Sequence, residues 1–342
     1  MNVRKMGGLV AVAAMLLAAG AAQAAITIDT VHVGDPGNAA DTRYATPGYG
    51  AVGYAYNIGK YEVTAGQYTA FLTAVAATDT YALYNTGMSS ASSSSGIARS
   101  GSSGSYTYSV AADFVNRPVN YVSYWDSCRF ANWLSNNQPT GAQGPLTTER
   151  GAYTLDGYTG EDGRTIQRSA NASWAVTSED EWYKAAYYKG GGTSAGYWDY
   201  PTGTNSAPGR DMTEATNPGN NANYYGTPFP IDSGKYTTLA GEFELSDSPY
   251  GTFDQGGNVW EWNEAIVYHD PDHASRGLRG GSFYSIDTLL ASYRSYGYYD
   301  DYYYPTVEYD LIGFRVSEVP EPATMALLAL GGLAVLRRRK SA

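Results

Sequence analysis

Regular helical periodicity covers only three short stretches of this chain, and this scarcity narrows the possible folds. The first stretch begins at Thr64, which has a glutamine three residues on in the spacing of a capping box. The second begins after Ser123 and the third after Ser178, where Glu181 completes another capping box. Beyond about residue 190 the chain consists of short apolar pieces separated by Gly, Pro, Asn and Asp. The sequence therefore predicts an α+β fold with few helices and much irregular, loop-supported chain.

Both ends of the chain have the composition of sorting signals. Residues 1–24 combine a basic start, a short apolar run and a small-x-small cleavage site, as a secretory signal peptide does. A transmembrane anchor is the alternative, but the run is short for one. At the other end, Pro320-Glu321-Pro322 precedes an apolar run over 323–336 and four basic residues. As a helix this run would rise about 21 Å, less than the ~30 Å hydrocarbon core of a membrane.

The C-terminal segment 319–342 resembles the PEP-CTERM sorting signal of Gram-negative bacteria. The resemblance implies export and transient inner-membrane anchoring through 323–336. It also implies processing by an exosortase-type enzyme that releases the body to the cell surface or extracellular matrix. The basic residues after the apolar run favour a cytoplasmic end. A plain membrane anchor is the alternative.

The charge of the chain limits its partners. The net charge is −11, and six of the 22 basic residues lie in the two terminal segments, so the body between them is more acidic still. Phosphate binding needs clustered Lys and Arg, so we expect no nucleic-acid partner. A divalent cation suits the acidity better. The single cysteine, Cys128, permits no internal disulfide, and its place on the apolar face of the second helix favours a buried core residue over a nucleophile.

The body divides into two unequal parts before the C-terminal signal. Residues 25–52 form an N-terminal lead-in, and residues 53–316 form the main domain. Within the domain, residues 88–106 are rich in serine and glycine. Such a composition predicts a flexible surface insertion that contributes nothing to a core.

The string "YGTFDQGGNVWEWNE", residues 250–264, has the composition of a cation-binding loop. Asp254 and Glu261 stand seven residues apart with two glycines and an asparagine between them. Calcium takes six to eight oxygen ligands, and the carboxylates and glycine-permitted turns of such a loop can supply them. From spacing alone, a solvated acidic turn is the alternative.

A series of strings along the chain resembles the formylglycine-generating-enzyme, or sulfatase-modifying-factor, domain, which is a variant of the C-type lectin fold. The resemblance covers about residues 53–316. In chain order the strings are "YEVTAGQYTAFL", "RPVNYVSYWDSCRFANWLS", "VTSEDEWYKAAYY", "NNANYYG", "GNVWEW", "LRGGS" and "IGFRV".

The resemblance implies a calcium-supported fold with two calcium sites. One site would use the side chains of Asp254 and Glu261 with the carbonyls of Gly257 and Val259. The other would use the Asn223 side chain, the Tyr224 carbonyl, Asp232 and the Gly234 carbonyl. The second set depends on an alignment through a variable loop. Structural calcium also suits an exported domain without disulfides, because a cation that binds only the folded state stabilises it.

The family's oxidase chemistry needs two cysteine thiolates that hold copper, and this chain lacks both. The resemblance places them at Ser285 and, by counting, at Leu290, and no cysteine follows Cys128 anywhere in the sequence. Soft Cu(I) prefers thiolate ligands, so we expect no copper and no formylglycine-generating activity.

Other catalytic arrangements find little support in the residues. His269 and His273 have a metal-ligand spacing if helical, but Asp270-Pro271-Asp272 between them favours a solvated loop. Asp300 and Asp301 could serve a glycosidase in principle, but chain neighbours seldom converge on one substrate. An enzyme of this family with non-cysteine, metal-dependent chemistry remains the alternative function.

A tyrosine- and aspartate-rich loop, residues 283–310, predicts a binding function. Tyrosine offers large amphipathic contact area at low entropic cost, and it stacks on sugar rings. In ligand-binding relatives of the same frame, this window carries the recognition residues. We therefore expect an exported surface or matrix module whose ligand is a surface polysaccharide or a protein; packing in a Tyr-rich protein is the alternative. The candidate ligand-binding residues are Tyr284, Tyr293, Tyr296, Tyr298, Tyr299, Asp300, Asp301, Tyr302, Tyr303 and Tyr304.

Overall fold

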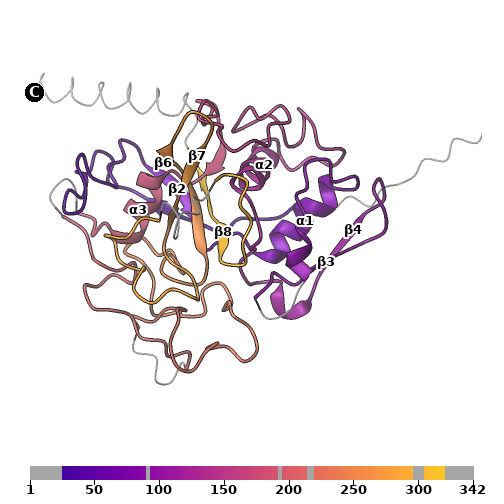
Figure 1. Cartoon of the computed structure of the whole chain (residues 1–342). Helices are drawn as coiled ribbons and strands as arrows, with labels where there is room; N and C mark the ends of the chain where they lie inside the picture. Colours follow the sequence, from indigo (N-terminus) through magenta and orange to yellow (C-terminus); the bar gives the residue numbers. More distant parts are fainter. Residues whose placement is uncertain (1–24, 90–92, 192–194, 214–218, 296–303, 320–342) are drawn as a thin grey trace, which may run out of the picture.

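The computed structural model of the chain describes residues 25–89, 93–191, 195–213, 219–295 and 304–319 (Figure 1). The signal peptide expected over 1–24 and the apolar run 323–336 lie outside these residues. Within them, no helix has the length and apolar character needed to cross a membrane.

Three α-helices form where the sequence predicts them, and each begins with a capping box. They are α1 (Ala65–Val75), α2 (Tyr124–Ser135) and α3 (Glu179–Tyr187). In each, the N-cap hydroxyl accepts from the backbone N–H three residues on, and the side chain at that third residue accepts from the N-cap N–H. These reciprocal bonds satisfy orphan donors of the first turn, which is why such short helices begin where they do. Two short 3₁₀ turns cover Thr86–Ser89 and Ala112–Phe114.

Two small sheets hold the domain together. The first has the order β1-β2-β9-β5, all antiparallel, and comprises β1 (Thr30–Val33), β2 (Tyr56–Gly59), β9 (Val316–Glu318) and β5 (Trp174–Val176). This sheet brings together segments that are far apart in the sequence. The lead-in segment 25–52 supplies its strand β1. The second has the order β7-β6-β8, and comprises β7 (Ala274–Arg279), β6 (Trp260–His269) and β8 (Ile312–Phe314). Here β6 pairs antiparallel with β7 and parallel with β8.

An aromatic core lies between the helices and the sheets. Phe130 of α2 contacts Phe71 of α1 and Phe314 of β8, with ring centroids 5.4 Å apart in both cases. Trp262 of β6 and Trp182 of α3 are fully buried. Edge-to-face contacts of this kind add to the free energy gained by burying the rings.

Long irregular segments occupy the chain between α3 and β6. No helix or strand longer than an isolated bridge forms in the described residues from Tyr188 to Val259. Figure 1 shows this part as loops that form the lower portion of the molecule. The expected α+β class, with few helices and much loop, is confirmed.

The serine- and glycine-rich stretch 88–106 differs from the expectation. Its described part contributes β3 (Ile97–Ser100), which forms an antiparallel hairpin with β4 (Thr107–Val110). Met88 and Ile97 are fully buried in the main core. The prediction that this stretch contributes nothing to a core is therefore wrong, because a few apolar residues among the serines reach the interior.

Candidate functional site

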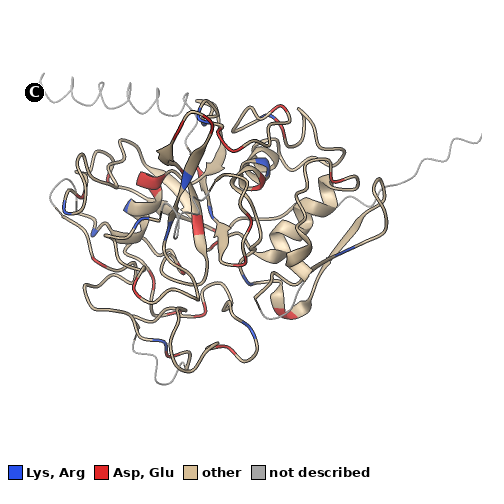
Figure 2. Ribbon diagram, viewed as in Figure 1, with Lys and Arg blue, Asp and Glu red and all other residues tan. Residues whose placement is uncertain are grey.

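A buried ion pair joins the central strand of the second sheet, β6, to Arg315, which lies between β8 and β9. Glu261 of β6 accepts from Arg315 at both carboxylate oxygens, Nε to Oε2 and Nη2 to Oε1, each at 2.6 Å. The indole Nε1–H of Trp182 donates to the same Oε2 at 2.7 Å. All three side chains are fully buried. Figure 2 shows acidic and basic positions side by side on the strands of this sheet.

Two more carboxylates lie near Glu261 in the interior. Asp254 accepts from the Gly241 N–H at 2.6 Å, and burial raises the pKa of its carboxyl to about 6. Glu62 accepts from Asn258 Nδ2 at 3.2 Å through Oε1, while its buried Oε2 has no hydrogen-bond partner among the described residues. Burial raises the pKa of Glu62 well above its usual value, and the charges of Asp254 and Glu261 raise it further.

This cluster contains more carboxyl groups than cationic groups. Glu62, Asp254 and Glu261 face a single buried cation, Arg315, which bonds only Glu261 among them. Unpaired carboxylates in the interior are costly unless they are protonated or matched by a cation. The oxygens of Glu62 and Asp254 have the chemistry that suits a hard divalent cation, whereas both oxygens of Glu261 are already bonded to Arg315. Sequence reasoning missed Glu62, although its acidic side chain directly before the first predicted helix was a signal that could have identified it.

Asn223, a candidate ligand of the second calcium site, lies beside Gly257 of the first set. The backbone joins the two, because Asn258 N–H donates to the Asn223 carbonyl at 2.8 Å and Gly257 adopts a positive φ against that carbonyl. Asn223 is 2% exposed, and its Oδ1 has no partner among the described residues. An unpartnered buried amide oxygen is a suitable cation ligand.

The other donors of the second set are engaged by arginines. The Tyr224 carbonyl accepts from Arg210 Nε at 2.7 Å, and Asp232 forms an ion pair with Arg117. Gly234 lies in the tight turn that Asp232 and Lys235 close. As the side chains stand, the described residues contain no group of three or more His, Cys, Asp or Glu arranged to hold a metal ion.

The positions of the two missing thiols have ordinary structural contacts. The Ser285 hydroxyl oxygen accepts from the Ser282 N–H at 2.9 Å, which closes the turn after Gly281. Leu290 is half-buried, and its carbonyl accepts from the Tyr293 N–H at 2.9 Å. Cys128 is buried within α2, and burial raises the pKa of its thiol.

Three of the candidate ligand-binding residues are described, and they have different surroundings. Tyr284 is 56% exposed and contacts Tyr225 and Phe229. Tyr293 packs on Trp260, and Tyr304 stacks on His273, with ring centroids 5.7 and 4.9 Å apart. The remaining candidates lie outside the described residues, namely Tyr296, Tyr298, Tyr299, Asp300, Asp301, Tyr302 and Tyr303.

An aromatic cluster that the sequence reading did not identify surrounds Tyr284. We call Tyr225, Phe229, Tyr236 and Tyr284 the aromatic platform. Neighbouring rings in it lie 5.0 to 5.4 Å apart. The aromatic residues of "NYYGTPFP" were the available signal, but nothing in the sequence places them beside residue 284.

The histidine pair occupies a hairpin, as expected for a solvated loop. His269 ends β6, and Asp270 N–H donates to the His273 carbonyl at 3.0 Å across the turn before β7. The His273 ring lies within hydrogen-bond distance of the Asp270 carboxylate.

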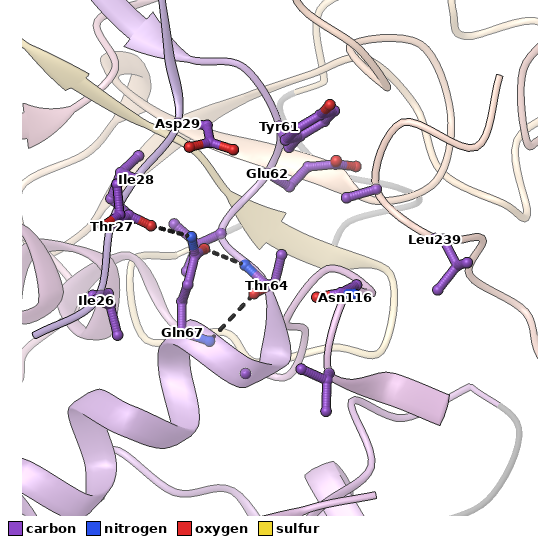
Figure 3. A pocket seen from close by; sticks show the side chains of 14 residues that line it. Ile26, Thr27, Ile28, Asp29, Tyr61, Glu62, Thr64, Gln67, Asn116 and Leu239 are labelled. Carbon is purple, nitrogen blue, oxygen red and sulfur yellow. Dashed lines mark hydrogen bonds between the residues drawn. The ribbon is translucent and has the colours of Figure 1, made fainter. Parts of the chain in front are cut away.

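A cleft of about 500 Å³ lies apart from residues 283–310, none of which lines it. Figure 3 shows Asp29 and Glu62 on one side of the cleft, and Leu239 across from Ile26. The capping box of Thr64 and Gln67 closes its base. The unpartnered Glu62 Oε2 is inaccessible to solvent, so the cleft offers no free charged group at that position.

Several solved structures are similar to this chain. The solved structure of CarF is similar over 86% of this chain and 99% of that chain, at 21% sequence identity and a TM-score of 0.50. Treponema denticola variable protein 1 is 20% identical over 88% of this chain and 100% of that chain, with a TM-score of 0.49. PvdO from Pseudomonas aeruginosa is 21% identical over 85% and 91%, with a TM-score of 0.44. No curated protein sequence matches this chain.

Two family models match the sequence. The PEP-CTERM protein-sorting motif matches residues 318–340, which indicates an exported protein that an exosortase processes at its C-terminus. The sulfatase-modifying factor enzyme 1-like domain matches residues 20–318. Since that match covers most of the sequence and the fold agrees with it, the chain belongs to the sulfatase-modifying factor enzyme 1-like family.

Proposed function

We propose that this protein is a binding module of the cell surface or extracellular matrix, with a ligand held by the Tyr/Asp-rich loop 283–310 and without formylglycine-generating activity. The observation that carries the proposal is the pair Tyr284 and Ser285. A largely exposed tyrosine directly precedes a serine at the position where the family's chemistry needs a thiolate. A hydroxyl cannot hold Cu(I), whereas exposed tyrosines favour recognition.

Calcium is the proposed structural cofactor. Asp254 and Glu261 with the carbonyls of Gly257 and Val259 would hold one ion, and the nearby buried Oε2 of Glu62, which has no hydrogen-bond partner among the described residues, supports it. The second ion would use Asn223, Tyr224, Asp232 and Gly234, and the unpartnered Asn223 Oδ1 supports it. Bound calcium would neutralise buried carboxylates and tie irregular segments together.

Release at the cell surface is the proposed fate of the exported chain. Residues 323–336 would anchor it transiently in the inner membrane until an exosortase-type enzyme cleaves the C-terminal segment. The run is short for a stable anchor, which suits a transient one.

Arrays of glycans, surface polymers and surface proteins test the binding proposal. The wild-type protein and a Tyr298/Tyr299/Tyr302/Tyr303 alanine variant would be compared at equal concentration. We expect the wild type to bind at least one class of ligand and the variant to lose most of that signal. Equal signals from the two proteins would remove the loop from the proposal.

An enzyme with non-cysteine chemistry is the second candidate, and one pair of carboxyls favours it. Burial raises the pKa of Glu308 to about 8 and that of Asp126 to about 6, and Asn85 donates to Glu308. Acid–base pairs with separated pKa values occur at catalytic sites, and also in buried structural networks. Incubation with copper and a sulfatase-type cysteine peptide tests the oxidase branch directly, since any formylglycine product would contradict the binding proposal.

A further inference from the structure

The aromatic platform is an exposed surface built from two separate segments of the chain. Tyr225 and Phe229 come from the irregular region before β6, and Tyr284 comes from the turn after β7. The Tyr225 N–H donates to the Ser285 carbonyl at 2.8 Å, and this bond fixes the two segments side by side. Tyr225 is 42% exposed and Tyr284 is 56% exposed, although their rings lie only 5.4 Å apart.

One buried ring and two half-buried rings support the two exposed tyrosines. Phe283 is fully buried and contacts Tyr236 at 5.4 Å, and Tyr236 contacts Phe229 at 5.0 Å. Phe229 in turn contacts both exposed tyrosines, at 5.1 and 5.4 Å. Pro228 and Pro230 restrict the backbone on either side of Phe229. Little conformational entropy is left to lose when a ligand covers such rings.

The chemistry of the platform combines apolar faces with unused polar groups. Among the described residues, nothing hydrogen-bonds the phenolic hydroxyl of Tyr225 or of Tyr284. The carboxylate-bearing neighbour Asp287 is exposed, and the whole chain is acidic. Of the basic neighbours, Lys235 is paired with Asp113, and Arg210 keeps its positive charge but turns its Nε to the neutral Tyr224 carbonyl. Such a surface disfavours polyanions and accepts neutral molecules that present both C–H faces and hydroxyls.

The size of the platform favours a sugar over a protein. A stable protein interface covers about 800 Å² on each partner, whereas an aromatic side chain buries only about 150–250 Å² in full. Tyr225 and Tyr284 already cover part of each other. The area that they can bury against a ligand is therefore well below the area that a protein partner covers. A pyranose ring needs one or two such faces and a few hydroxyl partners.

We propose that the aromatic platform binds a neutral carbohydrate by stacking of sugar rings on Tyr225 and Tyr284. This rests on the proposed binding function and names its ligand class, and it extends the site beyond loop 283–310 to residues 225–236. Phe229 and Tyr236 act as positioning residues that hold the two exposed rings.

The test uses the full-length exported protein and arrayed hexasaccharides. Neutral β-linked glucose and mannose hexamers are compared with hexamers of uronic acids, and binding is quantified by calorimetry. We expect binding to at least one neutral hexamer, with a dissociation constant at least about tenfold weaker for Tyr225→Ala/Tyr284→Ala. The double phenylalanine variant Tyr225→Phe/Tyr284→Phe keeps the rings and should stay within about threefold of the wild type. Tyr44→Ala removes a tyrosine that is about as exposed as Tyr225 but contacts Arg43 instead of the platform, and it should bind as the wild type does.

Several outcomes overturn the carbohydrate proposal. Binding to uronic acids alone, binding to a protein alone, or an unchanged affinity of the double alanine variant would each do so. If the alanine variant of residues 298–303 loses a ligand that Tyr225→Ala/Tyr284→Ala still binds, the platform proposal fails while the proposed function stands. If no glycan, polymer or protein binds the wild type, both fail. The thermal melt of the alanine variant shows whether it folds. The phenylalanine variant, which keeps both rings, is the folded reference for that melt.

Discussion

The ion pair between Arg315 and Glu261 is protected from solvent, in contrast to the exposed pair between Arg150 and Asp156. Removing one partner of a buried pair leaves an uncompensated charge, which costs about 3–5 kcal/mol of unfolding free energy. We expect Arg315→Met to lose stability on this scale. Arg315→Lys should lose less, because lysine keeps a positive charge beside Glu261; some loss remains, because lysine cannot donate to both carboxylate oxygens in the planar geometry of a guanidinium. Urea unfolding measures both variants.

Arg150→Met is the control for this prediction. Arg150 bonds Asp156 at 2.7 Å, but both side chains are about half exposed, at 59% and 45%. Solvent and salt screen such a pair, so its urea midpoint should not change. A similar loss in Arg150→Met and Arg315→Met would contradict the argument from burial.

Glu308 makes the stability of the folded protein depend on pH. Its pKa in the folded state, about 8, lies above the usual value of 4.5. The folded state therefore binds the proton more tightly, and the stabilisation is fully present below about pH 4.5 and is lost as the pH rises through 8. Glu308→Gln mimics the protonated form. We expect its melting temperature to match the wild type near pH 5 and to exceed it by about 2 °C or more at pH 9.

Glu244→Gln is the matched substitution, because Glu244 is exposed and lies away from Asp126 and Asn85. Its melting temperature should follow the wild type at both pH values. A constant difference between Glu308→Gln and the wild type from pH 5 to 9 would mean that Glu308 does not titrate in this range.

The hairpin of β3 and β4 is a structural element and not a dispensable insertion. Ile97 opens β3 and is fully buried in the main core. Replacement of a buried isoleucine by alanine costs about 2–5 kcal/mol of unfolding free energy, and we expect Ile97→Ala to fall in this range. Ser102→Ala, in the exposed turn between the strands, should leave the urea midpoint within error of the wild type. Equal effects of the two substitutions on the urea midpoint would mean that the hairpin is a surface insertion and not part of the core.

The sequence predicted the helices well because their signals are local. Thr64, Ser123 and Ser178 each cap a helix through bonds that reach only three residues along the chain. Ile97 was missed because composition averages over a window and hides one apolar residue that reaches the core. The platform was missed for another reason: Tyr225 and Tyr284 lie 59 positions apart in the sequence, and no periodic pattern encodes such a contact between irregular loops.

At the scale of the whole molecule, the acidity and the irregular backbone both favour stabilisation of the folded state by a bound cation. The chain has a net charge of −11, only short sheets and no possible internal disulfide. Its long loops depend on buried polar contacts such as that between Asn258 and the Asn223 carbonyl. Ionised carboxylates in the interior that have no partner would destabilise the folded state unless a cation neutralised them. One proposed ligand from each calcium site, Asn223 and Gly257, meets at that contact, so we expect a bound ion to stabilise these loops.

Calcium removal is therefore expected to destabilise the protein. Saturation at about one hundred times the dissociation constant contributes about 2.7 kcal/mol, so the melting temperature should fall by several degrees when a chelator replaces calcium. Asp254→Asn should reduce this difference, and so should Asn223→Ala, since each removes a ligand of a different site. Asp272→Asn, at the exposed turn between β6 and β7, should keep the full difference. Identical melts of the wild type in calcium and in chelator would count against both sites, whereas a loss in only one variant would assign the stabilisation to the site of that residue.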